Sequence, residues 1–174
     1  MSLYVVTLPT LSNGDRALVE TARARFDSQH DAVSPHATLV FAIERLDVDA
    51  LASHVVSLTR GVARFSCMFR RTLVAPDIAT AGSCVLLVPD EGREELTRLP
   101  DALYTGVLAA DLRSDLAFVP HITVARTRST EDARSIAESL DPRLLTMKAQ
   151  IDTSDVVVAI KGQSIRAARK IVLT

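Results

Sequence analysis

SPHATLVF, residues 34–41, and VPHITVAR, residues 119–126, are the two stretches on which the interpretation of this chain depends. Each places a histidine directly after a proline and a threonine two residues later, and each continues with mainly apolar residues. A β-branched, apolar run that follows a proline is typical of a strand that begins at a sheet edge. Because the chain has only 4 histidines among 174 residues, accident is a poor explanation of the repeat.

A shift of 85 residues superposes the two stretches and the segments that follow them. The coincident pairs are Pro35 with Pro120, His36 with His121, Thr38 with Thr123, Leu51 with Ile136, Ala52 with Ala137, and Val55 with Leu140. This agreement indicates an internal duplication of a β-α-β-α-β unit. We expect one domain of two pseudo-symmetric lobes, at about 1–76 and 77–174, and we leave open an exchange of terminal strands between them.

Hydrophobic periodicity and turn residues predict the individual elements. The expected strands are 3–8, 36–43, 63–74, 84–88, 118–125, 145–160 and 164–173, the last two forming a hairpin that turns at 161–163. The expected helices are 15–29, 48–58 after a cap at Asp47, 91–104 with an interruption at Pro100, and a helix that begins with a capping box at Ser129 and Asp132. The expected fold class is α+β, with antiparallel sheets lining a central cleft and helices outside.

Composition excludes several classes of function. With 20 basic and 21 acidic side chains the formal net charge is −1, so the chain has no general attraction for DNA or anionic membranes, and an anionic substrate must be held locally. The first residues, MSLYVVTLPT, lack the basic region and the length of a signal peptide or membrane span. We therefore expect a cytoplasmic protein without a membrane partner, and a monomer.

The cysteines and histidines do not have the spacing of a metal site. Cys67 and Cys84 stand alone, without a CxxC pattern, and are predicted to be ordinary core residues. A site with two histidines as metal ligands is disfavoured, because threonine hydroxyls are poor ligands and no carboxylate or thiolate stands at a matching spacing. Neither a metal nor another cofactor is expected.

Alternation of side chains along a strand gives each repeated stretch a polar face and a core face. His36 and Thr38 share one face of their strand, as do His121 and Thr123 of theirs. The residues expected to point the other way are Ala37, Leu39, Phe41, Ile122 and Val124. By strict alternation Arg126 also falls on the core side, and it reaches the polar face only if the strand ends or bends near Ala125.

Two imidazoles at one place can act as acid and base toward a phosphodiester. Their unperturbed pKa of about 6.5 allows one ring to be neutral and the other protonated near neutral pH. The hydroxyls of Thr38 and Thr123 could donate hydrogen bonds to the non-bridging phosphate oxygens, and Arg126 could add a bidentate cationic contact. The predicted catalytic residues are therefore His36 and His121, and the predicted phosphate-binding residues are the two threonines and Arg126.

At these residues the chain resembles the 2H phosphoesterase superfamily, which includes the bacterial 2′-5′ RNA ligase-like proteins and the cyclic phosphodiesterases. PHATLVF is similar to the first motif of that family, and PHITVAR to the second, including its arginine. The resemblance implies a bilobal α+β fold and metal-independent hydrolysis of a 2′,3′-cyclic nucleotide or RNA end, or of ADP-ribose 1″,2″-cyclic phosphate, or else 2′-5′ RNA ligation. It also implies His121 as the base and His36 as the acid.

One alternative class and the identity of the substrate stay open at this stage. The same residues could form a non-catalytic module that binds RNA ends or a phosphorylated metabolite. A substrate from a phosphonate pathway is open as well. Tyr4, Phe41 and Phe69 are the candidate aromatic platforms for a base, although core positions are expected for all three. The loops 75–83 and 109–117 are expected to contact whatever the phosphate carries.

Overall fold

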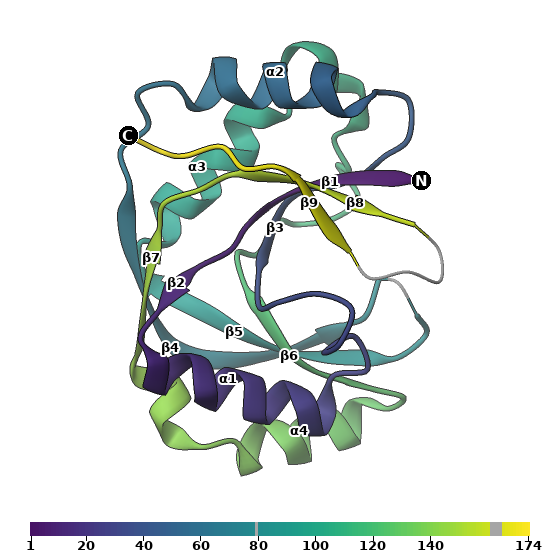
Figure 1. The fold of residues 1–174 in the computed structure, drawn as a ribbon. Coiled ribbons are helices and arrows are strands. Elements are labelled where there is room, and N and C mark those ends of the chain that lie inside the picture. Colours follow the sequence, from purple (N-terminus) through teal and green to yellow (C-terminus); the bar gives the residue numbers. More distant parts are fainter. Residues whose placement is uncertain (79, 161–164) are drawn as a thin grey trace.

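Nine strands and four α-helices form the part of the chain that the computed structural model describes, which is residues 1–78, 80–160 and 165–174 (Figure 1). The strands are β1 (Ser2–Thr7), β2 (Thr10–Leu11), β3 (Ala37–Ile43), β4 (Phe65–Pro76), β5 (Ser83–Glu91), β6 (Ile122–Thr127), β7 (Met147–Ile151), β8 (Asp155–Ala159) and β9 (Arg166–Arg169). The helices are α1 (Asn13–Phe26), α2 (Val48–Thr59), α3 (Arg93–Leu103) and α4 (Thr130–Ser139), with 3₁₀ helices η1 (Gly106–Asp111) and η2 (Pro142–Thr146).

The strands form two antiparallel sheets with helices on their outer sides. Among the described residues, one sheet has the order β3-β1-β8-β9 and the other the order β2-β7-β4-β5-β6. Figure 1 shows α2 and α3 on the outer side of the four-stranded sheet, and α1 and α4 on the outer side of the five-stranded sheet. The predicted α+β class with antiparallel sheets and outer helices is confirmed.

Each sheet takes strands from both halves of the chain. β4 pairs with β5 and β7 in the five-stranded sheet, whereas β8 pairs with β1 and β9 in the four-stranded sheet. The helix α1 also packs against β6, although it precedes β3 in sequence. The boundary expected near residue 76 therefore falls between two paired strands of one sheet, and neither layer corresponds to a continuous half of the chain.

The carboxyl-terminal strands differ from the prediction. The segment 145–160 is two strands, β7 and β8, that belong to different sheets. The chain passes from one sheet to the other at Asp152–Ser154, where Thr10 Oγ1 donates to Asp152 and Thr153 forms an isolated bridge with Val172. The last predicted strand is reduced to β9, which pairs with β8, and the turn predicted at 161–163 lies outside the described residues.

Two further boundaries differ for local reasons. The strand expected from Phe118 begins at Ile122, because Pro120 has no amide hydrogen to contribute to a ladder. The interruption expected at Pro100 is absent, and α3 continues through it to Leu103. Pro100 is buried beside Leu96 and Leu99, and this burial offsets the missing helical hydrogen bond.

The helix caps and the cysteines agree with the prediction. Asp47 accepts a hydrogen bond from the Ala50 amide at the start of α2, and Ser129 accepts one from the Asp132 amide at the start of α4. Cys67 and Cys84 are buried, and burial raises their thiol pKa values to about 12 and about 11. No helix in the described residues combines the length and the apolar composition needed to cross a bilayer.

Candidate active site

The two repeated motifs lie on the edge strands of different sheets. His36 directly precedes β3, and His121 directly precedes β6. In the described part of the chain β3 ends one sheet order and β6 ends the other, so each motif has one side free of a neighbouring strand. The prolines before the histidines, Pro35 and Pro120, are buried where no ladder hydrogen bond is required of them.

A β-bulge in β6 places Arg126 on the same face as Thr123. Thr123 is opposite Leu86 of β5, whereas Ala125 is opposite Val85, the adjacent residue of β5. Adjacent residues of β5 face opposite sides of the sheet, so Ala125 lies on the other side from Thr123, although positions two apart share one face in a regular strand. Arg126 then returns to the face of Thr123, because the bulge supplies the bend near Ala125 on which this placement depended.

The strand β3 contains the same bulge at the equivalent position. Thr38 is opposite Val6 of β1, whereas Val40 is opposite Val5. Val40 is fully buried, whereas Phe41 is half-buried and does not belong to the core. The expected core position of Phe41 is wrong for this reason, and the strict alternation assumed for this strand ends at the bulge.

The two motifs have the same degree of burial at each pair of equivalent positions. The half-buried positions are His36, Thr38 and Phe41 in the first motif, and His121, Thr123 and Arg126 in the second. The buried positions between them are Ala37, Leu39, Val40, Ile122, Val124 and Ala125. The duplication therefore extends to the three-dimensional placement of each side chain, and the chemical difference on this face is a phenyl ring in one motif and a guanidinium in the other.

The same hydrogen bond orients both imidazoles. His36 Nδ1 lies 2.9 Å from the carbonyl oxygen of Ser34, and His121 Nδ1 lies 2.6 Å from the carbonyl oxygen of Val119. A carbonyl oxygen can only accept, so each Nδ1 carries a hydrogen and donates it. In the neutral rings Nε2 therefore keeps its lone pair and is the nitrogen able to exchange a proton.

The environment of His36 keeps this ring neutral. The pKa of His36 is lowered to about 4, chiefly by burial, and the charges of Arg23, Arg126 and His121 lower it further. The hydrogen bond to Ser34 opposes these effects only in part. Arg126 lies in β6 and His121 directly precedes it, so their effect on His36 indicates that the second motif lies near the first.

His121 is neutral near pH 7 as well. Burial lowers its pKa, the charge of Arg126 adds to the effect, and the hydrogen bond to Val119 works in the opposite direction. The free protein therefore presents two neutral imidazoles at one site. An anion placed between them would raise both pKa values.

Arg126 is held by buried carboxylates. Its Nη1 forms an ion pair with Oδ1 of Asp27, its Nε lies 3.7 Å from Oδ2 of Asp77, and its side chain is 17% exposed. Burial alone would raise the pKa of Asp27, but the hydrogen bond from Gln29 and the interactions with Arg126 and Arg23 outweigh it, so that the pKa of Asp27 is lowered. Arg126 is thus a fixed positive charge beside the histidines.

The prediction from sequence did not include Arg23, which lies in α1, or Asp27, which caps the end of this helix. Arg23 is 1% exposed, and its Nε donates to Oδ2 of Asp27 at 3.0 Å. The signal for this pair was two opposite charges spaced i and i+4 on the same side of α1 as the buried residues Val19 and Ala22. In an isolated sequence that spacing is also typical of a solvated surface pair.

The candidate aromatic residues divide into two groups. Phe69 is fully buried, as expected. Tyr4 is half-buried and alternates with Val5, so it lies on the face of β1 that also carries Val6, opposite Thr38. Tyr4 therefore belongs to the face of the four-stranded sheet that carries the first motif.

A metal-binding set does not occur among the residues that the structure describes. No three side chains of the kinds His, Cys, Asp and Glu gather there as ligands for one ion. The donor set at the motifs consists of imidazoles, hydroxyls and a guanidinium, which suits an anionic ligand better than a cation.

Two facing sheets that each present a His-x-Thr motif define the class of the 2H phosphoesterases. The family model described as the 2′-5′ RNA ligase superfamily matches residues 11–163, and this chain belongs to that superfamily. The expected relationship is thereby confirmed over most of the chain.

Relatives by sequence carry the name "Putative phosphoesterase". The Bacillus pumilus protein is 25% identical over 164 residues, covering 94% of this chain and 92% of its own length. The Bacillus licheniformis protein is 24% identical over 154 residues, covering 87% and 86%. These relatives match most of the chain, so the matched region spans both halves.

Solved structures share the fold at low sequence identity. The Thermus thermophilus protein TT0787 superposes with a TM-score of 0.66 at 22% identity, covering 99% of this chain and 98% of its own. Escherichia coli LigT with 3′-AMP gives 0.61 at 15% identity, covering 99% and 98%. Kluyveromyces marxianus Usb1 gives 0.62 at 9% identity, covering 95% and 96%. The two-sheet arrangement is therefore common to proteins with little sequence in common.

Proposed function

We propose that this protein hydrolyses the cyclic phosphate of a small nucleotide or RNA end by acid–base catalysis with two histidines. The observation that carries the proposal is that His36 and His121 are oriented in the same way. In each ring Nδ1 donates a hydrogen bond to a backbone carbonyl oxygen, and this bond leaves Nε2 available for proton transfer. Membership of the 2′-5′ RNA ligase superfamily and the phosphoesterase relatives support the reaction class.

Hydrolysis of a 2′,3′-cyclic phosphate requires one proton removed and one proton supplied. One Nε2 accepts a proton from water as the water oxygen bonds to phosphorus, and the other ring, protonated, gives its proton to the 3′ oxygen as the bond to phosphorus breaks. The product is a 2′-phosphate. By the family resemblance, His121 is the base and His36 the acid.

The charge that develops on phosphate in this reaction has three candidate partners. Thr38 and Thr123 have half-buried side chains on the faces of the two histidines, where their hydroxyls can donate to non-bridging oxygens. Arg126 supplies a fixed positive charge from the same face of β6. These contacts would stabilise the pentacoordinate transition state more than the bound substrate.

The low pKa of His36 sets a condition on its role as the acid. At a pKa of about 4 the free ring is almost entirely neutral at pH 7. The acid role then requires that the substrate phosphate restore the proton when it binds, which a negative charge beside the ring favours. The reverse order, with His36 as base, places the same condition on His121, whose pKa is also lowered, and site-specific kinetics must separate the two.

Nucleotides are the proposed substrate class because of what related proteins bind. Crystal structures of Escherichia coli LigT are described as complexes with 3′-AMP, NADP⁺, ATP and phosphate. For the present chain we propose 2′,3′-cyclic nucleotides and RNA ends first. ADP-ribose 1″,2″-cyclic phosphate and 2′-5′ RNA ligation come second.

A panel of cyclic phosphates monitored by ³¹P NMR tests the proposal, since it also identifies which ester bond breaks. His36→Ala and His121→Ala are each expected to lower turnover by at least about 10²-fold. The matched control is His54→Gln, because His54 bonds to the Leu103 carbonyl at the contact of α2 with α3 and lies outside both motifs. Full turnover in either alanine variant would eliminate the two-histidine mechanism.

A binding module without catalysis is the second candidate, and one observation favours it. The pKa values of both imidazoles are lowered in the free protein, so the protonated form that would act as the acid is disfavoured before an anion arrives. In this case 2′-AMP would bind tightly to the protein while every cyclic phosphate in the panel remained intact.

A further inference from the structure

Arg23 is a fully buried cation whose hydrogen bonds run in two directions. Its Nε donates to Asp27 at 3.0 Å, and its Nη2 donates to the carbonyl oxygen of Val33 at 2.7 Å, with the carbonyl oxygen of Gln29 at 3.4 Å. The planar guanidinium is suited to this task, because it holds several donors at fixed angles. A lysine could provide the charge but not this geometry.

Both directions end at the candidate active site. The second carboxylate oxygen of Asp27 pairs with Arg126, which belongs to the second motif. Val33 is followed by Ser34, whose carbonyl oxygen accepts the hydrogen bond that orients His36 of the first motif. A chain of contacts therefore runs from Arg126 through Asp27 and Arg23 to the segment that holds His36.

We propose that Arg23 is a positioning residue that fixes Arg126 and His36 relative to each other across the two sheets. This rests on the proposed function, in which His36 and Arg126 act on one phosphate. Displacements of about 1 Å between such groups reduce rates strongly, so a rigid connection between elements of different sheets has a direct effect on turnover.

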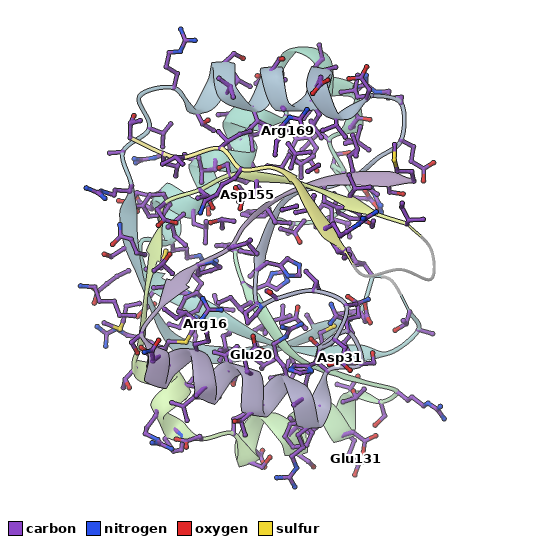
Figure 2. All side chains as sticks on the ribbon, viewed as in Figure 1. Arg16, Glu20, Asp31, Glu131, Asp155 and Arg169 are labelled. Carbon is purple, nitrogen blue, oxygen red and sulfur yellow. The ribbon has the colours of Figure 1, made fainter. Side chains whose placement is uncertain are left out.

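A contribution to folding stability does not by itself explain why an arginine occupies position 23. Among the described residues, Arg23 Nη1 is buried without a hydrogen-bond partner, and Glu20 Oε2 lies 3.6 Å away (Glu20 is labelled on α1 in Figure 2). A buried charge with an unfilled donor is costly, and apolar side chains of similar volume frequently replace such groups without loss of stability. The arginine is better explained by the groups that it holds in place.

Arg23 also contributes to the electrostatic environment of His36. The charged and titratable groups that act on this ring are Arg23 from α1, and Arg126 and His121 from β6. Removal of the Arg23 charge should therefore raise the pKa of His36, whereas Arg23→Lys should preserve it. This difference separates the effect of charge from the effect of geometry.

A histidine titration by NMR on the free protein tests the electrostatic part without any substrate. In Arg23→Met the His36 signal should titrate about 0.5 to 1 pH unit higher than in the wild type. The control is Arg25→Met on the same helix, where the exposed guanidinium lies over the Phe26 ring, 4.8 Å from its centroid. An unchanged His36 titration in Arg23→Met would overturn this part of the proposal.

Kinetics on a cyclic phosphate test the geometric part. Arg23→Lys should lower kcat by at least about tenfold while KM changes less than about threefold, because positioning matters most in the transition state. The effect should be non-additive with Arg126→Lys, so that the double variant is at most about threefold slower than Arg126→Lys alone. Wild-type kcat in a folded Arg23→Lys protein would overturn the proposal.

Asp27→Asn provides an independent variant if Arg23→Lys does not fold. It preserves the shape of the side chain but removes the charge that joins the two arginines, and the same loss of kcat is expected. An absence of turnover in the wild-type protein would count against the proposed function, whereas the NMR titration would still decide whether Arg23 controls His36.

Discussion

Phe41 and Arg126 occupy equivalent positions in the two motifs, each five residues after its histidine and each half-buried. A β-bulge at the same place in β3 and β6 produces this equivalence. The duplicated site is thus symmetric in its histidines and threonines and asymmetric in charge.

Arg126→Met should reduce both activity and stability. Removal of the cation is expected to lower kcat/KM by about 10²-fold, since the transition state loses a charged partner. It also leaves Asp27 buried with one fewer partner, which should cost about 3 kcal/mol in the free energy of unfolding. Steady-state kinetics and urea denaturation measure the two effects. Arg128→Met, at an exposed neighbouring position, is the control and should match the wild type in both.

The kcat/KM of cyclic phosphate hydrolysis should be highest below pH 6.5 and should fall as the pH rises from there. Catalysis needs one neutral and one protonated imidazole, and the pKa values of both His36 and His121 in the free protein are lowered from 6.5. The singly protonated state is therefore most populated on the acid side of that value. A pH profile of kcat/KM checks this, and an optimum above pH 7.5 would contradict it.

The unfolding free energy should decrease as the pH falls from about 6.5 to about 4. The pKa of His36 is about 4 in the folded protein and about 6.5 when unfolded, so the unfolded chain takes up the proton first and is favoured by acid. The loss amounts to at most about 3 kcal/mol over this range. Urea denaturation at several pH values measures it. In His36→Asn the slope over this pH range should be smaller, and an equal slope would assign the effect to other groups.

The two thiols should be inert in the folded protein. Burial raises the pKa of Cys67 to about 12 and that of Cys84 to about 11, so almost no thiolate is present at pH 8. A disulfide reagent such as DTNB should therefore label both cysteines only at the rate of unfolding, and immediately in guanidinium chloride. Rapid labelling of the native protein would show that one of these side chains is accessible.

Local features could be predicted from the sequence because short-range physics determines them. The caps at Asp47 and Ser129 depend on residues within one turn, and both were predicted. The histidine pair was found because a duplication repeats chemistry at a constant spacing. The predicted roles of these residues still depend on the experiments described above.

Long-range pairing could not be predicted in the same way. The sheet that each strand joins depends on contacts between residues far apart in sequence, as in the pairing of β1 with β8. The alternation of apolar and polar residues within one strand does not specify its neighbours. A bulge also cannot be recognised from the pattern of apolar residues along a strand. The core position expected for Phe41 was wrong because regular alternation was assumed. Arg23 and Asp27 were not recognised as site residues from the sequence. Two opposite charges spaced i and i+4 are expected both on a helix that covers a site and on a helix that faces water.

The interleaving of strands from both halves has a consequence for biosynthesis. β1 lies between β3 and β8, so the strand next to the first motif obtains its second neighbour only when residues 155–159 have been made. A nascent chain that ends before them exposes an unpaired strand edge, where non-native pairing with other chains can begin. The histidine pair should therefore reach its final arrangement only after residues 155–159 have left the ribosome.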